Sequence, residues 1–192
     1  MLLLRKPSAA AIHRFLASQA NLDVSYPAVG ATSATAPPGY VVDHTRMLLG
    51  RGEPAFAAAK AALQGWEHFN LGWVQLCWPD TAPEVGRVVA VLAHVSGVWW
   101  LNACRIIYVM NEQGRVKRFG FAYGTLPEHA ESGEERFTIE WHPDDSVWYD
   151  ILAFSRPNRL IVRLGYPLVR SVQKRFARDS ARAMQLAVAK TK

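Results

Sequence analysis

The chain has 192 residues, of which 50% are hydrophobic and 20% are charged, so it is long enough to bury one core and is expected to form one domain, residues 1–192. Its net charge of +6 hides an asymmetry. From Arg156 onward ten Lys and Arg stand against one acid, giving +9, whereas the preceding residues carry −3. The excess of positive charge therefore lies entirely in the C-terminal segment.

Neither export nor membrane insertion is expected from the sequence. The opening apolar run, residues 1–4, is far too short for a signal-peptide core, and basic residues follow it instead of preceding it. The uncharged stretch 88–104 falls short of the roughly 20 residues of a spanning helix and is broken by a Ser-Gly pair. Cys77 and Cys104 show no disulfide or zinc spacing, which suits a reducing compartment. A cytoplasmic protein without a metal site is expected.

The N-terminal part predicts a helix followed by an arm. Residues 7–19 begin near a proline and place apolar residues three and four apart, which is typical of a short amphipathic helix. The following stretch, 21–40, is rich in Pro, Gly, Ser and Thr, but it is too apolar for disorder and predicts a long ordered arm. The N-terminal helix and arm, 1–38, thus precede a main structural core, 39–192.

A strand and a helix come next. Residues 39–52, GYVVDHTRMLLGRG, predict a strand bounded by glycines. Residues 53–66 place Pro54 in a first turn, alanines in the middle and Gly65 at the end, which together predict a helix.

Six further runs rich in Val, Ile, Trp, Tyr and Phe predict antiparallel strands joined by hairpins, because short turn-like breaks separate them and no helix intervenes. They are residues 71–78, 86–95, 97–112, 114–126, 135–142 and 146–155. The remainder, 157–190, predicts a long amphipathic helix with a break or restart at 165–167. The predicted fold class is α+β: a curved antiparallel sheet gripping a long C-terminal helix, with an extra N-terminal helix and arm.

Five sequence blocks carry a family resemblance. They are YPAVGAT (26–32), GRGEPAFAAAKAALQGWEHF (50–69), CRIIYV (104–109), GFAYGTLPEHAESGEERF (120–137) and AFSRP (153–157). In this order they resemble the signature blocks of uncharacterised protein family 0548, a domain of unknown function found in bacteria and plants. That family is distantly similar to the START and birch-pollen-allergen superfamily of helix-grip proteins. The resemblance implies an apolar cavity between the sheet and the terminal helix.

The stretch 119–141 holds the residues most suggestive of chemistry. In the strand 119–126, large side chains share one face, and mostly small residues, Gly and Ala, share the other. The bare face would allow a helix or a ligand to approach the backbone closely, or the sheet to curve there, and helix packing or curvature is favoured over a ligand. The loop residues Glu128 and Glu131 are expected to be solvated. Glu134 and Glu135 adjoin a strand in which neighbours face opposite sides, so one of the two can point inward. An inward glutamate is expected to form a structural ion pair with Arg105, Arg118 or Arg136, and it could transfer protons only if it lines a cavity.

These observations leave three classes of function open. The first, which we favour, is a module that binds a small apolar or amphipathic molecule. Trp99 and Trp100 must face opposite sides of a strand, so one of them is expected to line the cavity. The full set of candidate ligand-binding residues is Tyr123, Arg105, Trp99, Trp100, Trp73, Trp141, Tyr149 and Glu135.

The second class is an enzyme of the cyclase, dehydratase or hydrolase kind, in which Glu135, His44 or Tyr123 moves a proton in the same cavity. The histidines and cysteines show no HExxH or CxxC spacing, and neither a GxSxG elbow nor a phosphate loop is present, so no metal or cofactor is expected. A cavity holding a titratable group of shifted pKa would favour catalysis, and an entirely apolar one would favour carriage.

The third class is an interaction protein that uses a basic surface of the terminal helix on an anionic membrane or on nucleic acid. Its residues are Arg163, Arg170, Lys174, Arg175, Arg178 and Arg182. No base-reading motif accompanies them, so a nucleic-acid partner is not expected and a solvated helix face is favoured, while peripheral membrane contact stays open.

Overall fold

The computed structural model describes residues 1–158 and 165–190, in which one antiparallel sheet is built from eight strands. The strand order is β2-β8-β7-β6-β5-β4-β3, and the short β1 pairs with β5. The strands are β1 (Leu2–Leu3), β2 (Val41–Arg51), β3 (Val74–Leu76), β4 (Val88–Val95), β5 (Val98–Gln113), β6 (Lys117–Thr125), β7 (Glu131–Trp141) and β8 (Ser146–Pro157). Consecutive strands from β3 to β8 are neighbours, so the hairpin prediction is confirmed.

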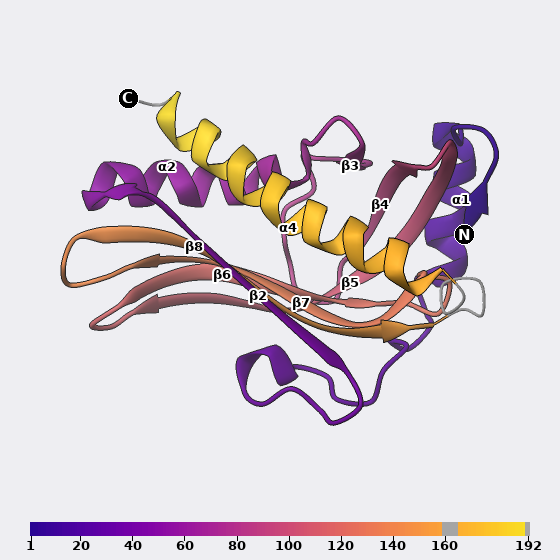
Figure 1. The fold of residues 1–192 in the computed structure, drawn as a ribbon, viewed down its shortest axis with the longest axis horizontal. Helices are drawn as coiled ribbons and strands as arrows, with labels where there is room; N and C mark the ends of the chain where they lie inside the picture. Colours follow the sequence, from indigo (N-terminus) through magenta and orange to yellow (C-terminus); the bar gives the residue numbers. More distant parts are fainter. Residues whose placement is uncertain (159–164, 191–192) are drawn as a thin grey trace.

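Three helices and two single turns complete the described chain. They are α1 (Ala9–Gln19), η1 (Ala31–Ser33), α2 (Gly52–Gln64), η2 (Glu67–Phe69) and α4 (Tyr166–Ala189). Helices α2 and α4 lie over one face of the sheet, called here the inner face (Figure 1). Helix α1 covers the opposite, outer face at β4 and β5, and the arm, residues 20–40, runs below the outer face of β6 to β8 (Figure 1). The predicted fold class, a curved antiparallel sheet gripping a C-terminal helix, is confirmed.

Helix α2 packs on the sheet through small side chains. Its buried residues Ala55, Ala59 and Leu63 recur every fourth position and therefore share one face. A Cβ added to Gly50 of β2 would lie 3.0 Å from the Ala55 side chain, which shows how closely helix and strand approach. Gly65 ends the helix, and its N–H donates to the Ala61 carbonyl, as the sequence predicts.

Helix α4 has two different halves. It begins at Tyr166 with Pro167 in its first turn, at the predicted restart, while residues 159–164 of the predicted terminal helix lie outside the described residues. Its buried residues, Ser180, Ala181, Met184 and Val188, all belong to the C-terminal half. In the N-terminal half Leu168 is 55% exposed, whereas Phe176 and Ala177, near the middle of the helix, are partly buried and pack against the core. No helix within the described ranges is long and apolar enough to cross a membrane.

Aromatic rings fill the core between α2 and the inner face. His68 of η2 lies among them, with ring centroids 4.7 Å from Phe69, 4.7 Å from Phe137 and 5.5 Å from Trp66. Neither ring nitrogen of His68 has a hydrogen-bond partner within residues 1–158 and 165–190. Burial lowers the pKa of His68 to about 3, so this imidazole is neutral in the folded protein.

We expect His68→Leu to raise the free energy of unfolding at pH 7 by about 1–2 kcal/mol, because the substitution removes a buried polar group without a partner. The folded pKa of about 3 lies below the unfolded value of 6.5, so the unfolded state binds the proton first and stability falls as pH drops below 6.5. The variant should lose this part of the acid sensitivity. Urea denaturation at pH 5 and pH 7 measures both effects, and a variant less stable than the parent at both values would contradict the prediction.

The arm is fastened to the outer face by Glu134 of β7. The carboxylate of this buried residue accepts hydrogen bonds from Tyr26 Oη at 2.7 Å, Gly30 N at 2.7 Å and Thr32 N at 2.9 Å, and also from Thr32 Oγ1. Tyr26 lies so close to β6 that a Cβ added to Gly124 would be 2.1 Å from its hydroxyl oxygen. The bare face of β6 is therefore covered at Gly124 by the arm, and not by a helix or a ligand.

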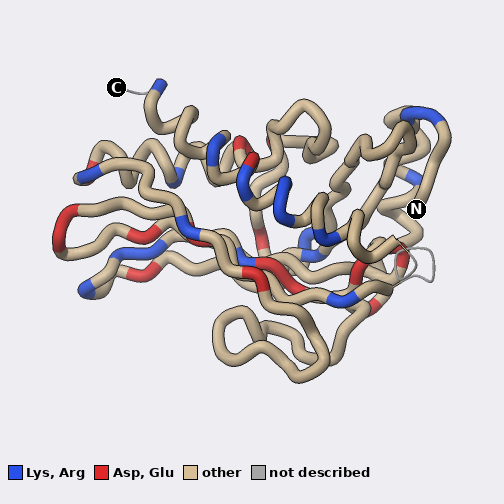
Figure 2. The backbone as a smooth tube through the Cα atoms, viewed as in Figure 1, with Lys and Arg blue, Asp and Glu red and all other residues tan. Residues whose placement is uncertain are grey.

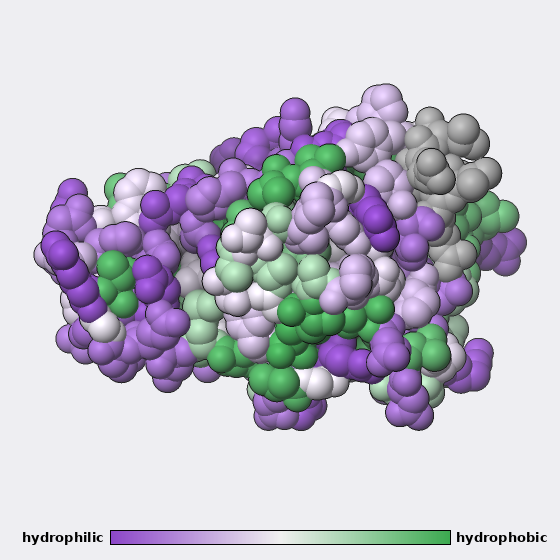
Figure 3. Space-filling view, turned by 90° about the horizontal axis from the view of Figure 1, so that it is seen from below, coloured by the Kyte–Doolittle hydropathy of each residue, from purple (hydrophilic) through white to green (hydrophobic). Residues whose placement is uncertain are grey.

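The side of the molecule that carries the arm has both hydrophilic and apolar regions. Viewed from that side, hydrophilic residues dominate the hairpin end of the molecule, and apolar residues gather toward the middle of the face (Figure 3). Asp150 of β8 is buried there and pairs with Arg136 at 3.0 Å and Arg46 at 3.2 Å. Arg136 also donates to the carbonyl of Thr32 at 2.8 Å, so the same ion pair helps to hold the arm.

Candidate ligand-binding cavity

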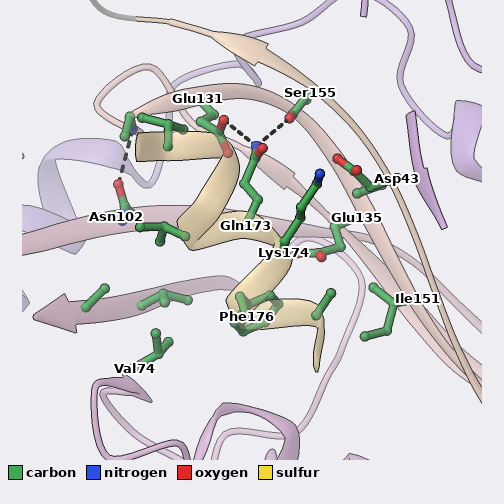
Figure 4. Close-up of a pocket in the computed structure, with 18 of the residues that line it drawn as sticks. Asp43, Val74, Asn102, Glu131, Glu135, Ile151, Ser155, Gln173, Lys174 and Phe176 are labelled. Carbon is green, nitrogen blue, oxygen red and sulfur yellow. Dashed lines mark hydrogen bonds between the residues drawn. The ribbon is translucent and has the colours of Figure 1, made fainter. Parts of the chain in front are cut away.

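A cavity of about 650 Å³ lies between the inner face of the sheet and the N-terminal half of α4 (Figure 4). Strands β2 to β8 all contribute to its wall, because the sheet curls around the helix. Most of the wall is apolar, and its larger apolar side chains are Met47, Phe69, Trp73, Val74, Val91, Trp100, Ile151, Leu168, Val172 and Phe176. A concave, mainly apolar site with a few polar groups is typical of small-molecule binding.

One polar group of the wall links α4 to the sheet. Gln173 of α4 donates a hydrogen bond from Nε2 to the carboxylate of Glu131 and another to Ser155 Oγ at 3.0 Å (Figure 4). Burial raises the pKa of Glu131 to about 7, although the Gln173 hydrogen bond acts to lower it. Arg170, one turn earlier, donates to both carboxylate oxygens of Asp43 in β2, at 2.5 and 2.6 Å. These bonds tie the N-terminal half of α4 to three strands.

A second carboxyl, Glu135, lies deeper along the same strand. The residue pairs across β6 and β7 with Tyr123, whose hydroxyl donates to Glu135 Oε2 at 2.7 Å. Burial raises the pKa of Glu135 to about 7; nearby Glu131 and Asp43 raise it further, and the Tyr123 hydrogen bond opposes the rise. Burial also raises the pKa of Tyr123 well above its ordinary value, so its hydroxyl keeps the proton.

Strand alternation separates the two adjacent glutamates. Glu134 faces outward to the arm, and Glu135 faces inward to the cavity, as expected for neighbours on a strand. The prediction that the inward glutamate pairs with an arginine is wrong, because the hydrogen-bond partner of Glu135 is Tyr123. Arg118 instead pairs with Glu140 at 3.1 Å on the outer face.

Glu131 was expected to be solvated on a hairpin tip, and this expectation is wrong. The residue is the first of β7 and lines the cavity together with Gly133 and Glu135. Positions 131, 133 and 135 share one face of a strand, so the signal was present once Glu135 was taken to face inward. Gln173, which holds Glu131, was missed because nothing in the local pattern marks it.

Two of the candidate tryptophans line the cavity. Trp73 donates from Nε1 to Asp179 of α4 at 3.1 Å, and the guanidinium of Arg175 lies 4.3 Å from the centre of its ring. Trp100 lines the wall from β5, whereas Trp99 stacks on His94 with ring centroids 4.4 Å apart and is not among the lining residues. The predicted opposition of the two adjacent tryptophans therefore holds in the structure.

His44 contributes to the cavity wall in β2, but its imidazole has another partner. His44 Nε2 lies 2.6 Å from Asp150 Oδ2, in the ion-pair group that holds the arm on the outer face. Proton transfer inside the cavity by His44, one of the enzymatic candidates, is therefore not what this geometry favours.

Three other candidates do not line the cavity. Arg105 donates to the carbonyl of Ala20 at 2.8 Å, at the start of the arm. Trp141 packs against Phe56 of α2, with ring centroids 5.7 Å apart. Tyr149 is fully buried, and its hydroxyl lies 3.0 Å from the Ser180 hydroxyl, under the packed half of α4. Each of the three residues has a structural contact that explains its position.

The cations of α4 are spread along the helix (Figure 2), and Lys174, Arg175, Arg178 and Arg182 are exposed. Lys174 and Arg178 also border the cavity. Arg175 and Arg178 each lie within 3.3 Å of the Asp179 carboxylate, so part of the basic charge is neutralised within the helix, while Arg182 is exposed. Arg163 lies outside the described residues. The part of the chain that the structure describes contains no group of three or more His, Cys, Asp or Glu residues placed to hold a metal ion.

Comparisons with known proteins agree with the sequence blocks. The family model "Domain of unknown function (DUF1990)" matches residues 25–183. A UPF0548 protein of Dictyostelium discoideum is 42% identical over 157 residues, covering 77% of this chain and 72% of the relative. A UPF0548 protein of Deinococcus radiodurans is 33% identical over 196 residues, covering 96% and 97% of the two chains.

Two solved structures are similar in shape at low sequence identity. Ara h 8.0201 is 12% identical with a TM-score of 0.47, covering 79% of this chain and 99% of that one. Norcoclaurine synthase from Thalictrum flavum, in complex with dopamine and hydroxybenzaldehyde, is 12% identical with a TM-score of 0.48, covering 90% and 98%. Neither likeness carries information about a ligand of this chain. The family match and the two curated relatives show that the chain belongs to the UPF0548 family, whose domain is the one named DUF1990.

Proposed function

We propose that this protein binds a small apolar or amphipathic molecule in the cavity between the sheet and α4. The supporting observation is the cavity itself, about 650 Å³ in volume, with an apolar wall and few polar groups. Arg170 and Gln173 support the proposal, because their polar contacts hold the N-terminal half of α4 above this space. We further propose that the chain forms one domain, since Glu134 joins the arm to the sheet. We also propose a cytoplasmic location, because the two cysteines are unpaired, as is usual in a reducing compartment.

A second candidate is an enzyme that transfers a proton in the same cavity. Glu135 favours it, because a carboxyl with a pKa of about 7, hydrogen-bonded to Tyr123, is suited to give or take a proton at neutral pH. Binding stays the primary proposal, because an enzyme acting in this cavity would also have to bind its substrate there. If a bound molecule is identified, its turnover by the parent protein and by Glu135→Gln would separate the two candidates.

Ala153→Phe is expected to abolish ligand retention, because Ala153 of β8 lines the cavity and a benzyl group would fill part of its volume. The measurement is native mass spectrometry of the protein purified from its own cytosol, followed by denaturing extraction of any retained molecule. Val109→Phe is the control, since Val109 is exposed and does not line the cavity. A parent protein that carries no molecule, and binds no apolar probe that Ala153→Phe excludes, would overturn the proposal.

A further inference from the structure

The cavity wall contains a carboxyl, Glu135, that forms no ion pair within residues 1–158 and 165–190. Three carboxylates, Asp43, Glu131 and Glu135, belong to its wall and face inward. Arg170 neutralises Asp43, and the side-chain amide of Gln173 donates to Glu131. Glu135 accepts only one hydrogen bond within residues 1–158 and 165–190, from Tyr123 to Oε2. Its Oε1 has no protein partner in this part of the chain, although an ionised carboxylate has room for about four donors.

The groups that surround Glu135 in the described residues are neutral, acidic or bonded elsewhere, apart from Lys174 at the border of the cavity. Tyr123 from β6, Cys104 from β5 and Tyr149 from β8 are neutral, because burial raises the pKa of each. Asp43 from β2 and Glu131 from the same strand are acidic, and both oppose ionisation of Glu135. From α4, Gln173 is bonded to Glu131. Lys174 borders the cavity, but it forms no ion pair within 4.0 Å of a carboxylate of the described residues.

We propose that the ligand is an amphipathic amine, whose protonated nitrogen binds the Glu135 carboxylate and the Tyr123 hydroxyl oxygen while its apolar body lies along Phe69, Trp73 and Phe176. This inference rests on the proposed binding function and narrows it to one chemical class. An ammonium group has three N–H donors, and the two oxygens offer acceptors side by side. The Tyr123 hydroxyl donates its proton to Glu135, so its lone pairs remain available to the ligand.

Three probes with the same chain, decylamine, decanol and decanoic acid, test the inference by titration calorimetry at pH 8, with the two charged probes below their micelle concentrations and decanol below its solubility limit. The amine is expected to bind at least about tenfold more tightly than the alcohol, because a hydrogen bond between charged groups is stronger than one between neutral groups. Glu135→Gln should remove this advantage and leave decanol binding within about threefold. Glu112→Gln is the control: this glutamate is exposed, pairs with Arg118 and does not line the cavity, so a change of less than about threefold in amine affinity is expected.

Proton release gives an independent result that a structural role of Glu135 would not produce. With a pKa of about 7, the carboxyl is about half protonated at pH 7, so amine binding should release about half a proton, measured in buffers of different ionisation enthalpy. Glu135→Gln should release none.

The outcomes separate the two proposals. Decanol or decanoic acid binding as tightly as decylamine, or equal proton release from the parent and Glu135→Gln, would overturn the amine inference and leave the binding function standing. If no probe binds, or if Ala153→Phe binds all three as the parent does, the proposed function itself fails.

Discussion

Replacing Glu134 by alanine should lower the free energy of unfolding by about 3 kcal/mol or more and should detach the arm from the sheet. The loss leaves the Tyr26 hydroxyl and the amides of Gly30 and Thr32 without an acceptor, and each buried unsatisfied donor costs about 1–3 kcal/mol. Urea denaturation gives the stability change, and limited proteolysis reports whether residues 20–40 become accessible.

The control for this prediction is Glu84→Gln. Glu84 is an exposed glutamate paired with Arg87 three residues later, and such surface pairs contribute less than about 1 kcal/mol. Its variant should match the parent in both assays. An arm that remains protected from protease in Glu134→Ala, with stability close to that of the parent, would show that the carboxylate does not hold it.

Glu135→Gln is expected to have the opposite effect, and the effect should depend on pH. The folded pKa of about 7 lies above the ordinary value of 4.5, so the folded protein keeps a proton that the unfolded chain loses between these values. The contribution of Glu135 to the free energy of unfolding is fully present below pH 4.5 and is lost as the pH rises through 7. The difference between the two pKa values corresponds to roughly 3 kcal/mol in the free energy of unfolding.

The variant should therefore be more stable than the parent by about 2–3 kcal/mol at pH 8, and by less than about 1 kcal/mol at pH 5. A glutamine preserves the acceptor for the Tyr123 hydroxyl, so the comparison isolates the charge. Urea denaturation across this pH range measures the difference. A variant that is less stable than the parent at pH 8 would show that Glu135 has a compensating partner, and it would weaken the amine inference as well.

Local signals predicted much of the fold. The start and end of α2 were visible because Pro54 and Gly65 act within one turn of the backbone. Strand alternation predicted that Glu134 and Glu135 face opposite sides, since the side-chain period of a strand does not depend on distant contacts. The two-residue strand β1 was missed, because its pairing with Trp99 and Trp100 lies far away in sequence.

The site was harder to predict, because alternation gives the face of a residue and not its depth. Tyr149 and Ile151 share the inner face of β8, yet Tyr149 lies under the packed half of α4, and Ile151 lines the cavity under the other half. The arm was likewise predicted as a segment but not as a cover. Its contact between Tyr26 and Glu134 spans 108 residues, and no local pattern encodes such a distance.

The two halves of α4 differ in the contacts that hold them to the rest of the protein. Its C-terminal half is anchored by apolar burial at Met184 and Val188, which water does not replace. Its N-terminal half is held by the polar bonds of Arg170 and Gln173, which water can exchange one by one, and by the packing of Phe176 near the middle of the helix. Removal of these polar bonds is therefore expected to loosen the first turns of α4 and to leave the packing of its C-terminal half intact.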